Sequence, residues 1–151
     1  MERAEPMMGE EEQHSLVSAK VSGASRLDVR WSNDQEATID LGKVLEDDAY
    51  SPLRQGAVFQ AVQIGDWGQS LVWPGEIEIG ADSLWLDCLS AWGREDTRAF
   101  LEWRLRNGFS AAAAAQALGI TRPSVVKYST GATVPRSIQL ACRGWDALKA
   151  A

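Results

Sequence analysis

The sequence is poor in the residues that enzymes and metal sites most often use. Its 151 residues include one histidine, His14, and only two cysteines, Cys88 and Cys142. Without a well-placed histidine, the sequence offers no Ser–His or Cys–His nucleophilic system and little of a zinc site. Its glycines stand at turns and form no phosphate-binding loop. We therefore expect no enzyme, no catalytic residues, no metal and no cofactor.

Long apolar runs and paired cysteines are also missing. No uninterrupted apolar segment approaches the roughly 20 residues that a membrane-spanning helix needs. The first 12 residues are acidic and lack the basic-then-apolar order of a secretory signal. The cysteines form no C-x-x-C pair and no disulfide framework, which favours small buried hydrophobes in a reducing compartment. We expect a soluble, cytoplasmic protein without membrane contact.

The charge of the chain is divided unevenly. Residues 1–93 hold 6 Lys and Arg against 17 Asp and Glu, a net charge of −11, whereas residues 94–151 hold 9 against 4, a net charge of +5. Such asymmetry indicates two parts with different partners, the basic part facing something anionic. The alternative is that surface charge merely drifts between domains for solubility.

The first part of the chain has the alternation of a small β-rich domain. Residues 1–24 show no sustained period and predict a disordered acidic leader. Residues 27–31 and 37–41 alternate as a hairpin, and the remaining strands are predicted at 57–64, 70–73 and 76–79. Short helical pieces are predicted at Ser51-Pro52 and behind Asp82. Residues 25–92 are thus predicted to form a small α+β domain.

After residue 93 the apolar period changes from two to 3.6. The first predicted helix is capped by Asp96 or Thr97 and ends at Asn107-Gly108. Three more are predicted at 111–118, at 122–129 and from Pro135 onward. The fold class is therefore predicted to be α+β: an N-terminal antiparallel-sheet domain with short helices, followed by an all-α four-helix domain over 93–151.

Two of these helices have the spacing of a helix-turn-helix. Only Gly119-Ile120-Thr121 separates them, which suits a near-perpendicular helix pair better than an antiparallel hairpin. Ala115 is small where two helices cross closely, and Gly119 can adopt the left-handed turn conformation without a Cβ penalty. From Ser110 to Pro135, the order of small residue, Leu-Gly, turn, recognition helix, aromatic residue, Gly and Pro resembles the lambda-repressor-like (Cro and repressor type) family of DNA-binding domains.

That resemblance implies double-stranded DNA as a partner. It places the third helix of the domain in the major groove, with its N-terminal residues toward the base edges. The side chains that it projects are Thr121, Arg122, Ser124 and Lys127. Arg122 is then the best candidate for a bidentate contact with guanine, and Ser124 could reach either base type. Lys127, Arg136, Arg104 and Arg106 would neutralise phosphates.

The segment departs from the family pattern in two ways. The family often has glutamine at the start of the second helix, where this chain has Ala111. The family also commonly has a fifth helix, whereas four are expected here, which leaves an apolar face for another chain or the N-terminal domain to cover. A four-helix module that uses its charges only for solubility is the alternative interpretation.

The N-terminal part resembles a small bacterial domain family, number 2442 among the domains of unknown function. The resemblance rests on the order R-L-D-V-R-W, A-T-I-D-L, S-P-L, V-F-Q-A-V and L-V-W-P-G-E-I-E-I-G-A-D-S-L. Its most distinctive piece is Trp73-Pro74-Gly75, followed by a short strand and a helix that contains Leu84. This resemblance implies a fold but no chemistry.

Together these patterns predict a bacterial, sequence-specific DNA-binding regulator of transcription. A single short helix reads few bases, so a homodimer is expected, with the N-terminal domain as its mediator. The alternative is a protein-interaction module, such as the antitoxin of a toxin–antitoxin pair, whose acidic domain binds a protein partner.

Overall fold

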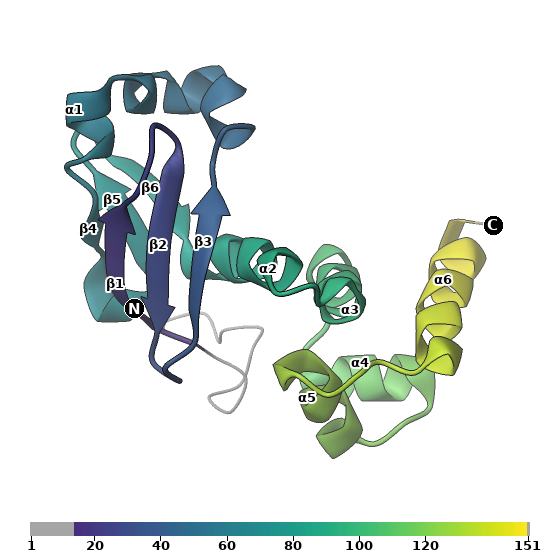
Figure 1. Ribbon diagram of the computed structural model, residues 1–151. Coiled ribbons are helices and arrows are strands. Elements are labelled where there is room, and N and C mark those ends of the chain that lie inside the picture. The colour runs from purple at the N-terminus through teal and green to yellow at the C-terminus, as the bar shows by residue number, and fades with distance from the viewer. Residues whose placement is uncertain (1–13, 151) are drawn as a thin grey trace, which may run out of the picture. The chain divides into compact units, whose positions relative to one another are not determined.

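The computed structural model describes residues 14–150, which form two compact units, His14–Gly93 and residues 94–150. The first unit contains two antiparallel sheets and short helices, and the second contains helices only (Figure 1). This is the α+β class that the sequence predicted. Each unit has its own buried apolar residues, and each is described below by itself.

The first sheet has the strand order β1-β2-β3. Its strands are β1 (Leu16–Val21), β2 (Arg26–Trp31) and β3 (Glu36–Asp40). In β2 the alternate residues Leu27, Val29 and Trp31 are buried, while the residues between them are exposed. The predicted hairpin is confirmed, because β2 pairs antiparallel with β3 from Arg26 opposite Asp40 to Arg30 opposite Glu36.

The strand β1 corrects the prediction of a disordered leader over residues 1–24. Leu16 pairs with Trp31 and Ser18 with Arg30, so Val17 is an extra residue in a bulge. Leu16 is buried, and its removal would leave a gap in the core of this unit. The bulge interrupts the alternation of the strand, which is why a period of two was not visible. The rest of the predicted leader, residues 1–13, lies outside the described residues.

The second sheet has the strand order β4-β5-β6. Its strands are β4 (Gln63–Ile64), β5 (Ser70–Trp73) and β6 (Ile77–Gly80). The strand predicted over residues 57–64 is wrong in its first half, where the short helix α1 (Gly56–Phe59) stands instead. The helical turn buries Phe59, whose backbone carbonyl accepts a 3.0 Å hydrogen bond from the indole Nε1 of Trp73.

Helices complete the first unit. Three short 3₁₀ helices are η2 (Val44–Glu46), η3 (Asp48–Arg54), which contains the predicted Ser51-Pro52, and η4 (Asp66–Gly68). The helix α2 (Ala81–Ala91) is longer than the predicted turn, and Gly80 rather than Asp82 is its N-cap. It buries Leu84, Trp85, Cys88 and Leu89, the spacing of an amphipathic helix.

The second unit consists of four α-helices within the described residues. They are α3 (Glu95–Asn107), α4 (Ala111–Leu118), α5 (Arg122–Thr130) and α6 (Arg136–Ala150). Left-handed glycines end two of them, Gly108 after α3 with φ 65° and Gly119 after α4 with φ 70°, as predicted. The core of the unit is centred on Phe100, Trp103 and Val125. Smaller side chains fill it: Ala111, Ala114, Ala115, Val134 and Cys142.

Candidate nucleic-acid interface

The helices α4 and α5 have well-defined ends on both sides of a three-residue connection. The Ser110 hydroxyl accepts a 3.1 Å hydrogen bond from the Ala113 N–H and so caps α4, as predicted. At the other end, the Ile120 N–H donates to the Ala115 carbonyl at 3.0 Å. Thr121 caps α5 by accepting from the Ser124 N–H at 3.3 Å. Hydrogen bonds therefore close both helix ends that border the connection.

Small side chains bring the two helices close together. Ala114 and Val125 are fully buried, and Ala115 is nearly so. The methyl groups of α4 fill little space, so that the backbone of α5 can approach α4 closely. Ile120 and Tyr128 pack against the same core and are partly buried. The pair is thus held by apolar contacts on one side and leaves its other side to solvent.

The predicted site residues at the start of α5 lie on this solvent side. Thr121, Arg122 and Lys127 are exposed, and Ser124 is half-buried. The hydroxyl groups of Thr121 and Ser124 form a hydrogen bond with each other at 2.9 Å. Both hydroxyls therefore serve the helix start, while the two cationic side chains extend from the helix surface.

Arg104 was predicted to contact a phosphate, and the structure corrects this prediction. Its side chain lies on α3 and is completely buried. Its Nη1 donates to the Ser129 hydroxyl at 2.8 Å and its Nε to the Phe109 carbonyl at 3.3 Å. Ser129 in turn donates to the Val125 carbonyl at 2.8 Å. Arg104 thus connects α3 to α5 from inside and cannot reach a ligand in solvent.

The other two predicted cations differ in their surroundings. Arg106 lies near the C-terminal end of α3, is exposed, and forms a 2.6 Å ion pair with Asp146 of α6. The hydrogen bond from Arg106 holds the pKa of the Asp146 carboxyl below its usual value of 3.8. Arg136 begins α6 and is exposed. Of the seven predicted residues, Arg122, Lys127, Arg136 and Arg106 are therefore the exposed cations, and Arg106 is the one whose ion pair with Asp146 is described above.

The sequence did not predict the hydrogen bonds that Asp96 and Arg104 form with other segments of the helical unit. Asp96 was predicted as a cap of α3, but its carboxylate accepts a 2.9 Å hydrogen bond from the Val134 N–H, in the segment after α5. Burial would raise the pKa of Asp96, yet the hydrogen bonds from the N–H groups of Val134 and Thr97, together with Arg94, lower it. One sequence signal for the buried position of Arg104 was available. Ser129 is a polar residue inside a predicted helix, and its hydroxyl is the group that accepts from Arg104.

Two further findings limit the chemistry of the described residues. Within residues 14–150, no group of three His, Cys, Asp or Glu side chains is placed to hold a metal ion. In the same part of the chain, no helix is both long and apolar enough to cross a membrane. Both cysteines are free and buried, and burial raises the pKa of each thiol to about 11.

Comparison with known proteins relates most of the chain to one solved structure. The chain is similar to the crystal structure of the candidate DNA-binding protein NE0471 from Nitrosomonas europaea, at 30% sequence identity and a TM-score of 0.69. The similarity covers 91% of this chain and 89% of that one. Residues 16–89 match the family described as protein of unknown function, DUF2442. No curated protein matches the chain.

The DUF2442 match confirms the resemblance predicted for the N-terminal part. It begins with β1 and ends within α2, so it falls inside the unit His14–Gly93. The helices α3 to α6 lie outside the DUF2442 match and are covered only by the similarity to the Nitrosomonas europaea protein. Neither comparison names a lambda-repressor-like domain for these helices.

Proposed function

We propose that this chain is a DNA-binding regulator of transcription in which α4 and α5 act as a helix-turn-helix of the lambda-repressor type. The observation that carries the proposal is the charge at the starts of three consecutive helices. α4, α5 and α6 have no acidic residue in their first turns, whereas α3 begins with Glu95 and Asp96. A helix N-terminus carries roughly half a positive charge, which an acidic residue usually balances. Here, an external anion could balance it.

Exposed cations reinforce the positive helix starts. Arg122 and Arg136 are the first residues of α5 and α6, where a cation is unfavourable for the helix itself. Lys127 adds a third exposed cation on α5. An arrangement that works against helix stability is understandable if its partner is a polyanion such as the phosphate backbone of DNA.

Most acidic residues of this unit lie beside cations of α3 or of its N-cap, Arg94. Asp96 lies 3.5 Å from Arg94, Glu102 lies 2.6 Å from Arg98, and Asp146 lies 2.6 Å from Arg106. Three of the four acidic residues in 94–150 are therefore engaged with cations other than those at the starts of α5 and α6. Arg122, Lys127 and Arg136 are all exposed cations of this unit.

The arrangement of α5 suits a role in base recognition. In a helix-turn-helix, the N-terminal residues of the second helix contact base edges in the major groove. Arg122 stands at this position and has the guanidinium geometry for a bidentate contact with guanine. Since the Thr121 and Ser124 hydroxyls bond to each other, we assign them the role of fixing the helix start beside Arg122. Lys127, Arg136 and Arg106 would then contact phosphates.

The similarity to the Nitrosomonas europaea protein also supports DNA binding. That protein is named a candidate DNA-binding protein, and its similarity to this chain extends over the helical unit as well as the sheets. Because one short helix reads few bases, we propose binding as a homodimer on two half-sites about one helical turn apart. The proposal includes no catalytic step.

The test is to identify a bound sequence and then to compare two cations. Fragments of the source genome that the full chain retains would give the sequence, and its affinity would be measured over a range of salt concentrations. Arg122→Ala should weaken binding to that sequence by about 1–3 kcal/mol and relax the preference at one base position. Lys127→Ala should weaken all sequences alike and reduce the slope of log affinity against log salt by about 1.

Lys20→Ala, in β1 of the other unit, is the matched control and should change neither quantity. Retention of no fragment together with a flat salt dependence would contradict the proposal. Equal effects of Arg122→Ala on every sequence would remove the base-reading role from that residue and leave it a phosphate contact.

A second candidate function is supported by a separate observation on the first unit. Trp67 is 72% exposed and has the left-handed φ of 55°, which is unusual for a bulky residue. Residues 14–93 hold 5 basic and 12 acidic residues. An exposed tryptophan in an acidic unit favours the binding of a basic protein partner, as expected of an antitoxin. A flat salt dependence of DNA binding with no preferred sequence would favour this second function.

A further inference from the structure

We infer that two copies of this chain pair through the outer face of α6, with their α6 helices antiparallel and crossing at Gly144. Apolar and small residues form a stripe along this face, which we call the α6 stripe: Leu140, Ala141, Gly144, Ala147 and Leu148. Leu140 is 51% exposed and Leu148 is 77% exposed. Removal of such apolar area from water is favourable, so the α6 stripe is suited to a contact with another apolar surface.

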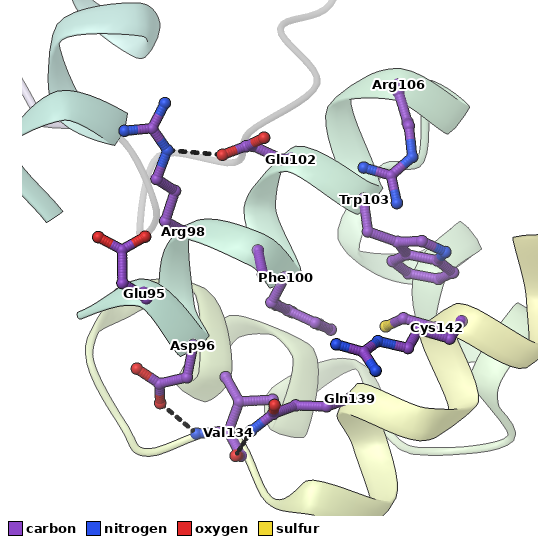
Figure 2. Close-up of a pocket in the computed structure, with 12 residues that line it drawn as sticks. Glu95, Asp96, Arg98, Phe100, Glu102, Trp103, Arg106, Val134, Gln139 and Cys142 are labelled. Carbon is purple, nitrogen blue, oxygen red and sulfur yellow. Dashed lines mark hydrogen bonds and ion pairs between the residues drawn. The ribbon is translucent and has the colours of Figure 1, made fainter. Parts of the chain in front are cut away.

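The opposite side of α6 is already packed against α3. Figure 2 shows Cys142 of α6 directed toward Phe100 and Trp103 of α3, and these three side chains belong to one buried cluster. On the same side, the Lys149 ammonium group donates to the side-chain carbonyl of Asn107 at 3.1 Å. The contacts that hold α6 in the helical unit therefore lie away from the α6 stripe.

The α6 stripe is symmetric about Gly144, and this symmetry points to a second copy as its occupant. Leu140 and Leu148 stand four residues before and after the glycine, and Ala141 and Ala147 stand three before and after. In an antiparallel pair that crosses at Gly144, Leu140 of each copy therefore meets Ala147 and Leu148 of the other. A two-fold dimer requires such self-complementarity, because the same surface serves on both subunits.

Gly144 allows a close approach of the two helices at their crossing. A methyl group built on Gly144 would have no atom within 4 Å, so packing inside one copy does not require a glycine there. Helix axes lie about 8–10 Å apart, depending on the side chains at the contact, and glycine permits the shorter distances. The leucines on both sides of Gly144 can then interdigitate across the pair.

The charges along α6 are compatible with antiparallel pairing. The α6 stripe contains no charged residue. The positive start of each α6 lies beside the negative end of the other, which is favourable. Arg143 lies about 100° around the helix from Gly144, so the two Arg143 side chains stand on the same rim of the pair. Salt screens their mutual repulsion, and higher salt should therefore strengthen the dimer, in contrast to DNA binding.

The test is the association of the full chain, measured by sedimentation equilibrium from about 1 to about 500 µM. We expect a dimer with a micromolar dissociation constant, because so short a stripe buries less than the roughly 1,200 Å² of a stable interface. Leu140→Lys and Leu148→Glu should each weaken association about tenfold or more, since each places a charge against apolar side chains of the other copy. Both positions are exposed, so circular dichroism should show unchanged folding.

An equimolar mixture of these two variants tests the antiparallel register. In the mixed dimer the new ammonium group lies opposite the new carboxylate, and the remaining Leu148 lies opposite the remaining Leu140. The mixture should therefore associate at least about tenfold more tightly than either variant alone. The control is Val17→Lys, which changes the exposed apolar residue of β1 in the unit that the sequence predicted as the dimer mediator, and it should leave association unchanged.

A monomer at every concentration, as expected if another part of the same chain covers the α6 stripe, would overturn the inference. Unchanged association of either leucine variant would do so as well, and so would a mixture no tighter than its components. The inference deepens the proposed function, on whose homodimer it rests, but the measurement contains no DNA. Its failure would remove this interface, whereas failure of the proposed function would appear as a lack of DNA binding.

Discussion

At the scale of single residues, Arg104 is the most informative position in the chain. An arginine is seldom fully buried, because taking its charge out of water is costly unless its donors are satisfied. Here the Ser129 hydroxyl and the Phe109 carbonyl accept from it, and Ser129 is itself buried. The buried side chain of Arg104 thus connects α3, α5 and the segment between α3 and α4 through hydrogen bonds.

We expect Arg104→Met to destabilise the helical unit by about 3 kcal/mol, because it leaves buried acceptors without donors and removes the connection between α3 and α5. Arg106→Met, two residues away on the same helix, removes an exposed ion pair and should cost less than about 1 kcal/mol. Urea unfolding of both variants, followed by circular dichroism, measures the two losses. Equal losses would contradict the structural role of Arg104.

The buried, connecting role of Arg104 could not be predicted from the identity of the residue alone. The sequence reasoning placed Arg104 with the exposed cations because the charge count of the C-terminal part offered no reason to separate it from Arg106. The difference arises only when the helices pack, since Arg104 faces Ser129 and Arg106 faces Asp146. In contrast, the caps Ser110 and Thr121 were predictable, because a cap acts on N–H groups two or three residues away.

At the scale of elements, the sequence predicted helices better than strands. The starts of α4 and α5 were predictable because capping and apolar spacing involve residues that are close in sequence, within about one helical turn. The segment Gly56–Phe59 was misassigned because four residues cannot distinguish a helical turn from a strand by period. The bulge at Val17 hid β1 in a different way, since one extra residue shifts the inward-facing side chains from one parity to the other.

Two glycines in the helical unit should respond in opposite ways to replacement by alanine. Gly119 has φ 70°, so Gly119→Ala should destabilise by about 1–2 kcal/mol through backbone strain alone, as no atom lies within 4 Å of the added methyl. Gly144 lies inside α6 with equally open space, and Gly144→Ala should stabilise by up to about 1 kcal/mol. Denaturant unfolding of both variants checks the signs. Destabilisation by Gly144→Ala would show an unrecognised contact on that face of α6.

At the scale of the whole molecule, the net charge conceals how the charge is arranged. The chain carries −6 overall, yet its helical unit is basic and its sheet unit acidic. Counterion release upon DNA binding depends on the cations that touch phosphates and not on the total charge of the protein. A net negative charge, which makes a protein bind to an anion-exchange column, is therefore compatible with DNA binding by the basic unit.

This separation can be tested by changing charge in one unit at a time. Glu46→Gln with Glu78→Gln makes the chain two charges less negative, in exposed positions of the sheet unit, and should leave the salt slope of DNA binding unchanged. Lys127→Ala changes the net charge by only one, yet should lower the slope by about 1. A slope that followed the net charge rather than the site would contradict the assignment of the interface to the helical unit.

The position of β1 also determines which shortened chains are worth preparing. A fragment that starts at residue 25 would keep β2 and β3 but leave one side of β2 with unpaired backbone N–H and C=O groups, and Leu16 would be gone from the apolar interior. Open strand edges recruit strands from neighbouring molecules. Oligomers or precipitates of such a fragment would then reflect the cut and say nothing about the natural assembly. Fragments for crystallisation or binding work should therefore begin before Ser15.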